Sequence, residues 1–152
     1  MAPNDDKTRR LKPRGNDTYL TDLDVRIWLR DNNPEANSLL DDVEFTPEEI
    51  RTAMTLTVDY WNDQPPYIGC YDYDKFPYRS QLLTGTAANL LFIAANRYRR
   101  NSLQYQAGGL TIQDQEKYQQ YDAAGQTLWQ QYKEWVTRNK RSLNAENGFA
   151  II

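Results

Sequence analysis

The stretch between residues 80 and 100 constrains the fold more than any other part of the sequence. A helix of this stretch would be apolar on most sides through its middle, so other elements have to cover most of its surface. Small residues within it would let those neighbours approach closely. We therefore expect the central helix of a helical domain here, with these apolar and small positions: Leu82, Leu83, Gly85, Ala87, Ala88, Leu90, Leu91, Ile93, Ala94 and Ala95.

A short helix is expected before it, over about 22–31. Thr21 suits the N-cap position, and two aspartates follow in the first turn, where the helix dipole favours negative charge. The helical spacing predicts one apolar face made of Val25, Trp28 and Leu29. The sequence DNNP then stops the helix.

The best-marked helix begins at TPEE, residues 46–49. Thr46 falls at the N-cap, Pro47 at the first helical position and Glu49 at the third, which is the pattern of a capping box. Two consecutive prolines end the helix near Asp63. Its apolar face is predicted to consist of Ile50, Met54, Val58 and Trp61.

A long helix over about 113–141 completes the set, and an irregular, aromatic-rich connection over 67–80 precedes the central helix. The expected fold is all-α, a small helical bundle of about four helices. It divides into a flexible basic N-terminal arm (1–20), a helical domain (21–141) and an extended C-terminal docking tail (142–152). The long helix carries its apolar stripe on Tyr118, Tyr121, Gly125, Leu128, Trp129, Tyr132, Trp135 and Val136.

Composition limits the chemistry. The chain has no histidine, which removes the usual general base near neutral pH, the usual transition-metal ligand and every imidazole-based triad. Its only cysteine, Cys70, excludes an intrachain disulfide and is expected to be a packed or idle thiol. A net charge of −3 argues against a general nucleic-acid coat. We predict no catalytic residue, no cofactor, no bound metal and no membrane span.

Three motifs have a structural interpretation beside a functional one. Gly108 and Gly109 precede a helix, where amides can bind phosphate, but without the residues of a P-loop a turn is the better interpretation. The acidic runs at 22–24 and 41–44 lack a calcium-loop pattern. Arg97, Arg99 and Arg100 complement the end of a helix, or they face DNA or an acidic partner.

Interface candidates come from the surplus of aromatic residues and from the two ends of the chain. Eleven tyrosines exceed what so small a core needs, and tyrosine is enriched where proteins meet. The N-terminal arm is basic and is either a solubilising tail or a docking arm. The apolar residues of the tail are expected to dock on a neighbouring subunit. The candidate interface residues are Arg9, Arg10, Tyr71, Tyr73, Tyr105, Phe149, Ile151 and Ile152.

Three segments together resemble the neck proteins of tailed-bacteriophage virions, that is, head–tail connector adaptors or head-completion proteins. They are TPEEIRTAMTLTVDYWNDQPP, FPYRSQLLTGTAANLLFIAANRYRRNSLQYQAGGLTI and LWQQYKEWVTRNKRSLNAENGF, and the similarity covers roughly residues 20–150. The resemblance implies a homo-oligomeric ring, commonly of twelve subunits, between the portal protein and a tail-side neck or tail protein. Packaged DNA would pass through the ring, and the protein would be made in the host cytoplasm and reside in the virion.

Two other functions stay open at this stage. A small helical DNA-binding regulator would use the N-terminal arm and the Arg97–Arg100 cluster, although the chain lacks a short helix–turn–helix with a basic recognition helix. A carboxylate-dependent metalloenzyme would have to rely on the clustered aspartates.

Overall fold

The computed structural model describes residues 19–31, 44–105 and 112–146, and these form four α-helices and no strand. The helices are α2 (Asp22–Leu29), α3 (Pro47–Asp63), α4 (Arg79–Tyr105) and α5 (Ile112–Glu146). The predicted all-α class is confirmed. No helix within these residues is long and apolar enough to cross a membrane.

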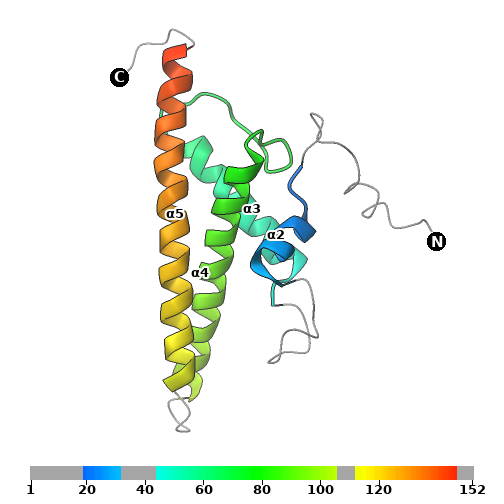
Figure 1. Cartoon of the computed structure of the whole chain (residues 1–152), viewed down its shortest axis with the longest axis vertical. Helices are drawn as coiled ribbons and strands as arrows, with labels where there is room; N and C mark the ends of the chain where they lie inside the picture. Colours follow the sequence, from blue (N-terminus) through cyan, green and yellow to red (C-terminus); the bar gives the residue numbers. More distant parts are fainter. Residues whose placement is uncertain (1–18, 32–43, 106–111, 147–152) are drawn as a thin grey trace, which may run out of the picture.

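Helix α4 is the central element, as the sequence predicted. It packs along α5 as an antiparallel hairpin and also contacts α3 and α2 (Figure 1). A close approach at Gly125 of α5 explains how tightly the two long helices pack, because a Cβ there would lie 2.9 Å from the ring of Phe92. Further along the hairpin, the rings of Tyr98 and Tyr121 stack with centroids 5.4 Å apart.

Both predicted helix starts are present in detail. Thr21 caps α2, and its hydroxyl accepts a hydrogen bond from the Asp24 amide while the Asp24 carboxylate accepts from the Thr21 amide. Thr46 and Glu49 form the same reciprocal pair at the start of α3. These two boxes satisfy amides that have no partner within the helix.

The buried face of α3 consists of the four residues that the spacing predicted, joined by Ala53 and Thr57. Trp61 is completely buried and lies at the centre of the core. The buried core also includes Val25 from α2, Phe45 and Phe76 from the connections, Leu82, Leu90 and Ala94 from α4, and Tyr132 and Val136 from α5.

Gly85 of α4 lies directly against Thr57 of α3. A Cβ at Gly85 would come closer to Thr57 Cγ2 than real atoms can approach. The Thr57 side chain cannot easily move away, because its hydroxyl donates to the Ala53 carbonyl and accepts from the side-chain amide of Asn89. The same Asn89 amide group also donates to the Gly85 carbonyl. The absence of a side chain at residue 85 therefore sets the spacing of α3 and α4.

We expect Gly85→Ala to destabilise the fold, although alanine favours helix by about 1 kcal/mol over glycine. Overpacking of this kind costs about 1–3 kcal/mol, and the rigid Thr57 puts the cost at the upper end. Adding Thr57→Ser removes the clashing methyl and keeps the hydroxyl, so the double variant should recover most of the loss in urea unfolding. Equal stability of the single and double variants would contradict this account.

The ends of the long helices differ from the sequence prediction. Helix α4 continues to Tyr105 rather than ending near 100, and α5 continues to Glu146 rather than ending at 141. The first residues of the expected extended tail, 142–146, are therefore helical, and the boundary at 142 was wrong. The cause is packing, since Asn144 is buried and Leu143 packs against the core. Residues 147–152 lie outside the described part.

Candidate interaction surfaces

Three aromatic side chains of the connection between α3 and α4, Tyr71, Phe76 and Tyr78, pack in or against the core. Trp61 donates from its indole nitrogen to the Gly69 carbonyl at 2.8 Å. Asn62 holds the backbone of Tyr71 through two hydrogen bonds, of 2.9 and 3.0 Å. As a result, the rings of Tyr71, Phe76, Tyr78 and Trp135 all pack within 6.5 Å of the Trp61 ring, measured between centroids.

This packing sorts the tyrosine candidates. Tyr71, expected at an interface, is half-buried against Trp61, whereas Tyr73 is exposed and Tyr67 exposes 78% of its surface. Cys70, expected to be packed or idle, is an exposed free thiol. Tyr105 is the last residue of α4, and its side chain lies outside the described part, as do Arg9, Arg10, Phe149, Ile151, Ile152 and the glycine pair Gly108–Gly109.

A buried lysine joins the end of α5 to the same connection. Lys140 is 1% exposed, its ammonium donates to the carbonyls of Gln64 and Pro66, and it lies 4.9 Å from the centroid of the Trp61 ring. Burial lowers the pKa of this ammonium. Lys140 was not among the residues singled out from the sequence, because the carbonyls that bind it are far away in the chain and leave no local pattern.

Arg97 was a candidate for contact with DNA, but its guanidinium is occupied within the domain. It donates to the Glu44 carbonyl at 3.0 Å and to the Glu49 carboxylate at 2.7 Å, and it lies over the Phe45 ring. Arg97 therefore connects α4 to the start of α3. Of the three arginines, Arg99 and Arg100 are exposed, and Arg99 lies 5.9 Å from the Tyr118 ring centroid.

Asp31 forms a clamp just beyond the end of α2. Its buried carboxylate pairs with Arg26 at 2.9 Å and accepts hydrogen bonds from the backbone amides of Glu44 and Phe45, the second at 3.0 Å. The clamp fixes the chain where it leaves α2 and where it returns to α3. From the sequence, Asp31 had no expected role other than stopping a helix.

Glu44 lies next to the clamp with its carboxyl half-buried. Its Oε1 is buried and has no hydrogen-bond partner among the described residues. Burial raises the pKa of its carboxyl; the Arg97 charge opposes this shift, and the negative charges of Asp31 and Glu49 add to it. The neighbouring Tyr98 hydroxyl also has its pKa raised, to about 12, mainly by burial and then by Glu44.

The raised pKa of Glu44 gives a stability prediction with a definite sign. The Glu44 carboxyl ionises less readily in the folded chain than in the unfolded chain. Its ionisation therefore lowers the free energy of unfolding, and this loss grows as pH rises from the unfolded pKa of about 4.5 through the folded pKa. Glu44→Gln should therefore melt above wild type at neutral pH. The difference should vanish below pH 4.5. Glu116→Gln, at an exposed position, is the control; a pH-independent effect of Glu44→Gln would refute the assignment.

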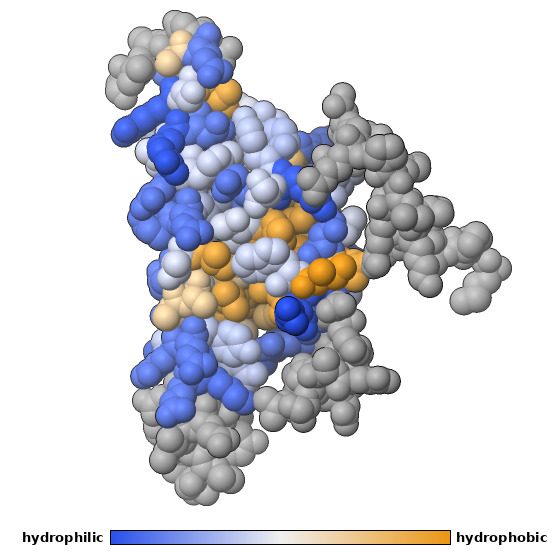
Figure 2. Space-filling view, viewed as in Figure 1, coloured by the Kyte–Doolittle hydropathy of each residue, from blue (hydrophilic) through white to orange (hydrophobic). Residues whose placement is uncertain are grey.

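The apolar residues on the surface gather on few elements. Ile27 and Trp28 of α2 are each 49% exposed, and Leu56 of α3 is 47% exposed. Trp28 was predicted to lie on one apolar face of α2 with Val25 and Leu29, and the structure leaves half of its surface exposed. Figure 2 shows apolar surface across the middle of the molecule, with hydrophilic surface along the upper and lower parts of the long hairpin.

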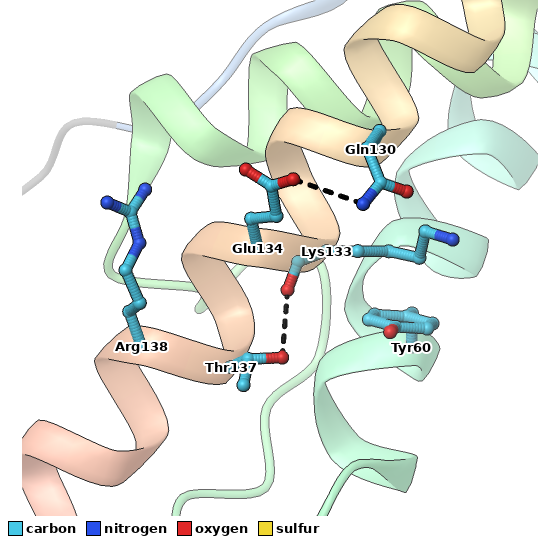
Figure 3. A pocket seen from close by; sticks show the side chains of 6 residues that line it. All are labelled: Tyr60, Gln130, Lys133, Glu134, Thr137 and Arg138. Carbon is cyan, nitrogen blue, oxygen red and sulfur yellow. Dashed lines mark hydrogen bonds between the residues drawn. The ribbon is translucent and has the colours of Figure 1, made fainter.

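A shallow polar groove lies between α3 and α5. Figure 3 shows the Lys133 side chain reaching toward Tyr60, while Glu134 and Arg138 project elsewhere. The polar groups bond within α5, Gln130 to Glu134 at 3.1 Å and the Thr137 hydroxyl to the Lys133 carbonyl at 3.1 Å. The groove is open and brings together no nucleophile and base. Its lining residues are Tyr60, Gln130, Lys133, Glu134, Thr137 and Arg138.

Metal-binding groups are likewise not gathered in the part of the chain that the structure describes. It contains no cluster of three or more acidic or cysteine side chains placed to bind a metal ion.

Comparison with known proteins gave no match to a family model, to a curated protein or to a solved structure.

Proposed function

We propose that the protein is a structural component of a tailed-bacteriophage neck, where identical subunits form a ring that joins the portal to the tail around the DNA passage. The proposal gives the chain a place in the virion and no catalytic role or cofactor. It rests on the resemblance of the three helical segments and on one observation about the surface.

That observation is the contrast between the polar and the apolar side chains. The groups best suited to chemistry, Asp31, Arg97 and Lys140, are bound by partners inside the domain. Large apolar side chains, Ile27 and Trp28 foremost, are left on the surface. An assembly component can bury such side chains against its neighbours, where aromatic residues are enriched.

The experiment is assembly of the full chain. Size-exclusion chromatography with light scattering over a range of concentrations, followed by electron microscopy of negatively stained fractions, should give a closed ring alone or on portal-bearing heads. Heads that join tails equally well without this protein would refute the proposal.

The DNA-binding regulator has less support, because Arg97 is committed to Glu44 and Glu49. Arg99 and Arg100 are exposed, so we expect any contact with DNA to be electrostatic and independent of sequence. Titration with two duplexes of different sequence at several salt concentrations measures this. A preference for one duplex that persists at physiological salt would favour the regulator.

A further inference from the structure

Helix α2 has two apolar faces and uses only one of them within the domain. Val25 is fully buried and Leu29 packs against the core, whereas Ile27 and Trp28 expose about half of their surface. Tyr19, just before the helix, is also exposed. Two adjacent large apolar side chains on one short helix form a small surface that no described residue fully covers, here called the α2 face (Ile27 and Trp28).

The chain supplies apolar side chains of matching kind directly after α5. Phe149 follows Glu146 by three residues, and Ile151 and Ile152 come next. Phe149 and Ile151 are two residues apart, so a chain crossing a surface in an extended course would present both to it. The helix that precedes this segment is joined to the rest of the domain at Lys140, whose ammonium donates to the carbonyls of Gln64 and Pro66.

The apolar segment cannot reach the α2 face of its own chain. Trp135 packs against Tyr78, 5.0 Å between ring centroids, so it lies level with the start of α4. Glu146 lies about 16 Å further along α5, since a helix rises 1.5 Å per residue. Phe149 lies at most about 11 Å from Glu146, the length of three extended residues.

The α2 face lies in the opposite direction. Asp24 pairs with Arg79 at the start of α4, at 2.8 Å, and α2 runs from there toward the level of Arg97, where Asp31 holds Glu44. Helix α4 also lies between α5 and α2 (Figure 1), and each packed pair of axes is about 8–10 Å apart. The gap from Glu146 to Trp28 therefore exceeds the reach of Phe149 and also that of Ile151, which lies at most about 18 Å from Glu146.

We propose that Phe149 and Ile151 of one copy dock on the α2 face of a second copy. Donor and acceptor are different surfaces of the same molecule, so each copy can give to one neighbour and receive from another. Such a contact is heterologous and closes into a ring when the rotation per copy allows it. This inference rests on the proposed ring and names the surfaces that connect its subunits.

Cysteine cross-linking between full-length chains tests the contact. In a Cys70→Ser background, Trp28→Cys protein is mixed with Phe149→Cys protein under mild oxidation, and the link is read by mass spectrometry of the joined peptides. Contact places the two thiols at a high effective concentration, so we expect about tenfold or more linkage over a control pair. The control replaces Trp28→Cys with Leu56→Cys, a similarly exposed apolar position on α3.

Each other outcome overturns the inference. Equal linkage in the control pair means random collision, and a dominant link between two molecules of the Trp28→Cys protein means that the α2 faces pair with each other. A third protein carries Trp28→Cys and Phe149→Cys in the same chain. A disulfide within that chain, formed in dilute solution, would mean that the segment reaches its own α2. Wild-type rings that form while the test pair fails to link refute the contact and leave the proposed function standing.

Discussion

Trp61→Ala is expected to lower the free energy of unfolding by about 3–5 kcal/mol, the usual loss for a buried tryptophan. Trp61 has no exposed surface, packs against four other aromatic rings and donates to the Gly69 carbonyl. The substitution also removes the ring beneath the Lys140 ammonium. For a chain of this size the melting temperature should fall by about 10 °C or more in circular dichroism.

Alanine variants of two other tryptophans serve as comparisons for Trp61→Ala. Trp28→Ala changes a half-exposed residue and should stay within about 0.5 kcal/mol of wild type. Trp129 was predicted to be a core anchor beside Trp61, but it is half-buried against Tyr60 and Tyr132, so Trp129→Ala should fall between the two. If Trp61→Ala had the same melting temperature as Trp28→Ala, the assignment of the core would be wrong.

Asp31→Ala is expected to cost about 3 kcal/mol, because it leaves Arg26, whose side chain is only 13% exposed, without its partner and two backbone amides without an acceptor. Asp31→Asn keeps an acceptor oxygen and loses the charge, so it should lie between alanine and wild type. Asp59→Ala, at an exposed position on α3, is the matched control. Urea unfolding measures all three, and equal effects at residues 31 and 59 would contradict the clamp.

Local sequence patterns predicted the parts of the fold that local interactions determine. The N-cap at Thr21 and the capping box at Thr46 involve residues three apart, and the buried face of α3 follows from helical spacing. The central position of α4 followed from its apolar circumference. These features depend on neighbours in the chain, so the sequence displays them directly.

The remaining features depend on contacts between distant residues. Lys140 is polar and lies in a polar run, and only its carbonyl partners at Gln64 and Pro66 explain its burial. Arg97 lies in a basic run that resembles a DNA-binding cluster until Glu44 and Glu49 are placed beside it. Trp28 has the helical spacing of Val25 and Leu29, but α2 is only 8 residues long and contacts the core through Val25 and Leu29.

The carboxylate of Asp31 also makes the domain tolerant of change between residues 32 and 43. That carboxylate pairs with Arg26 and accepts hydrogen bonds from the backbone amides of Glu44 and Phe45, so it joins the two ends of the segment directly. The entropy of closing a loop grows only with the logarithm of its length, so doubling this segment would cost about 0.6 kcal/mol. A foreign epitope or a small tag inserted there would leave the helical scaffold intact. The segment is therefore a suitable place to label the protein.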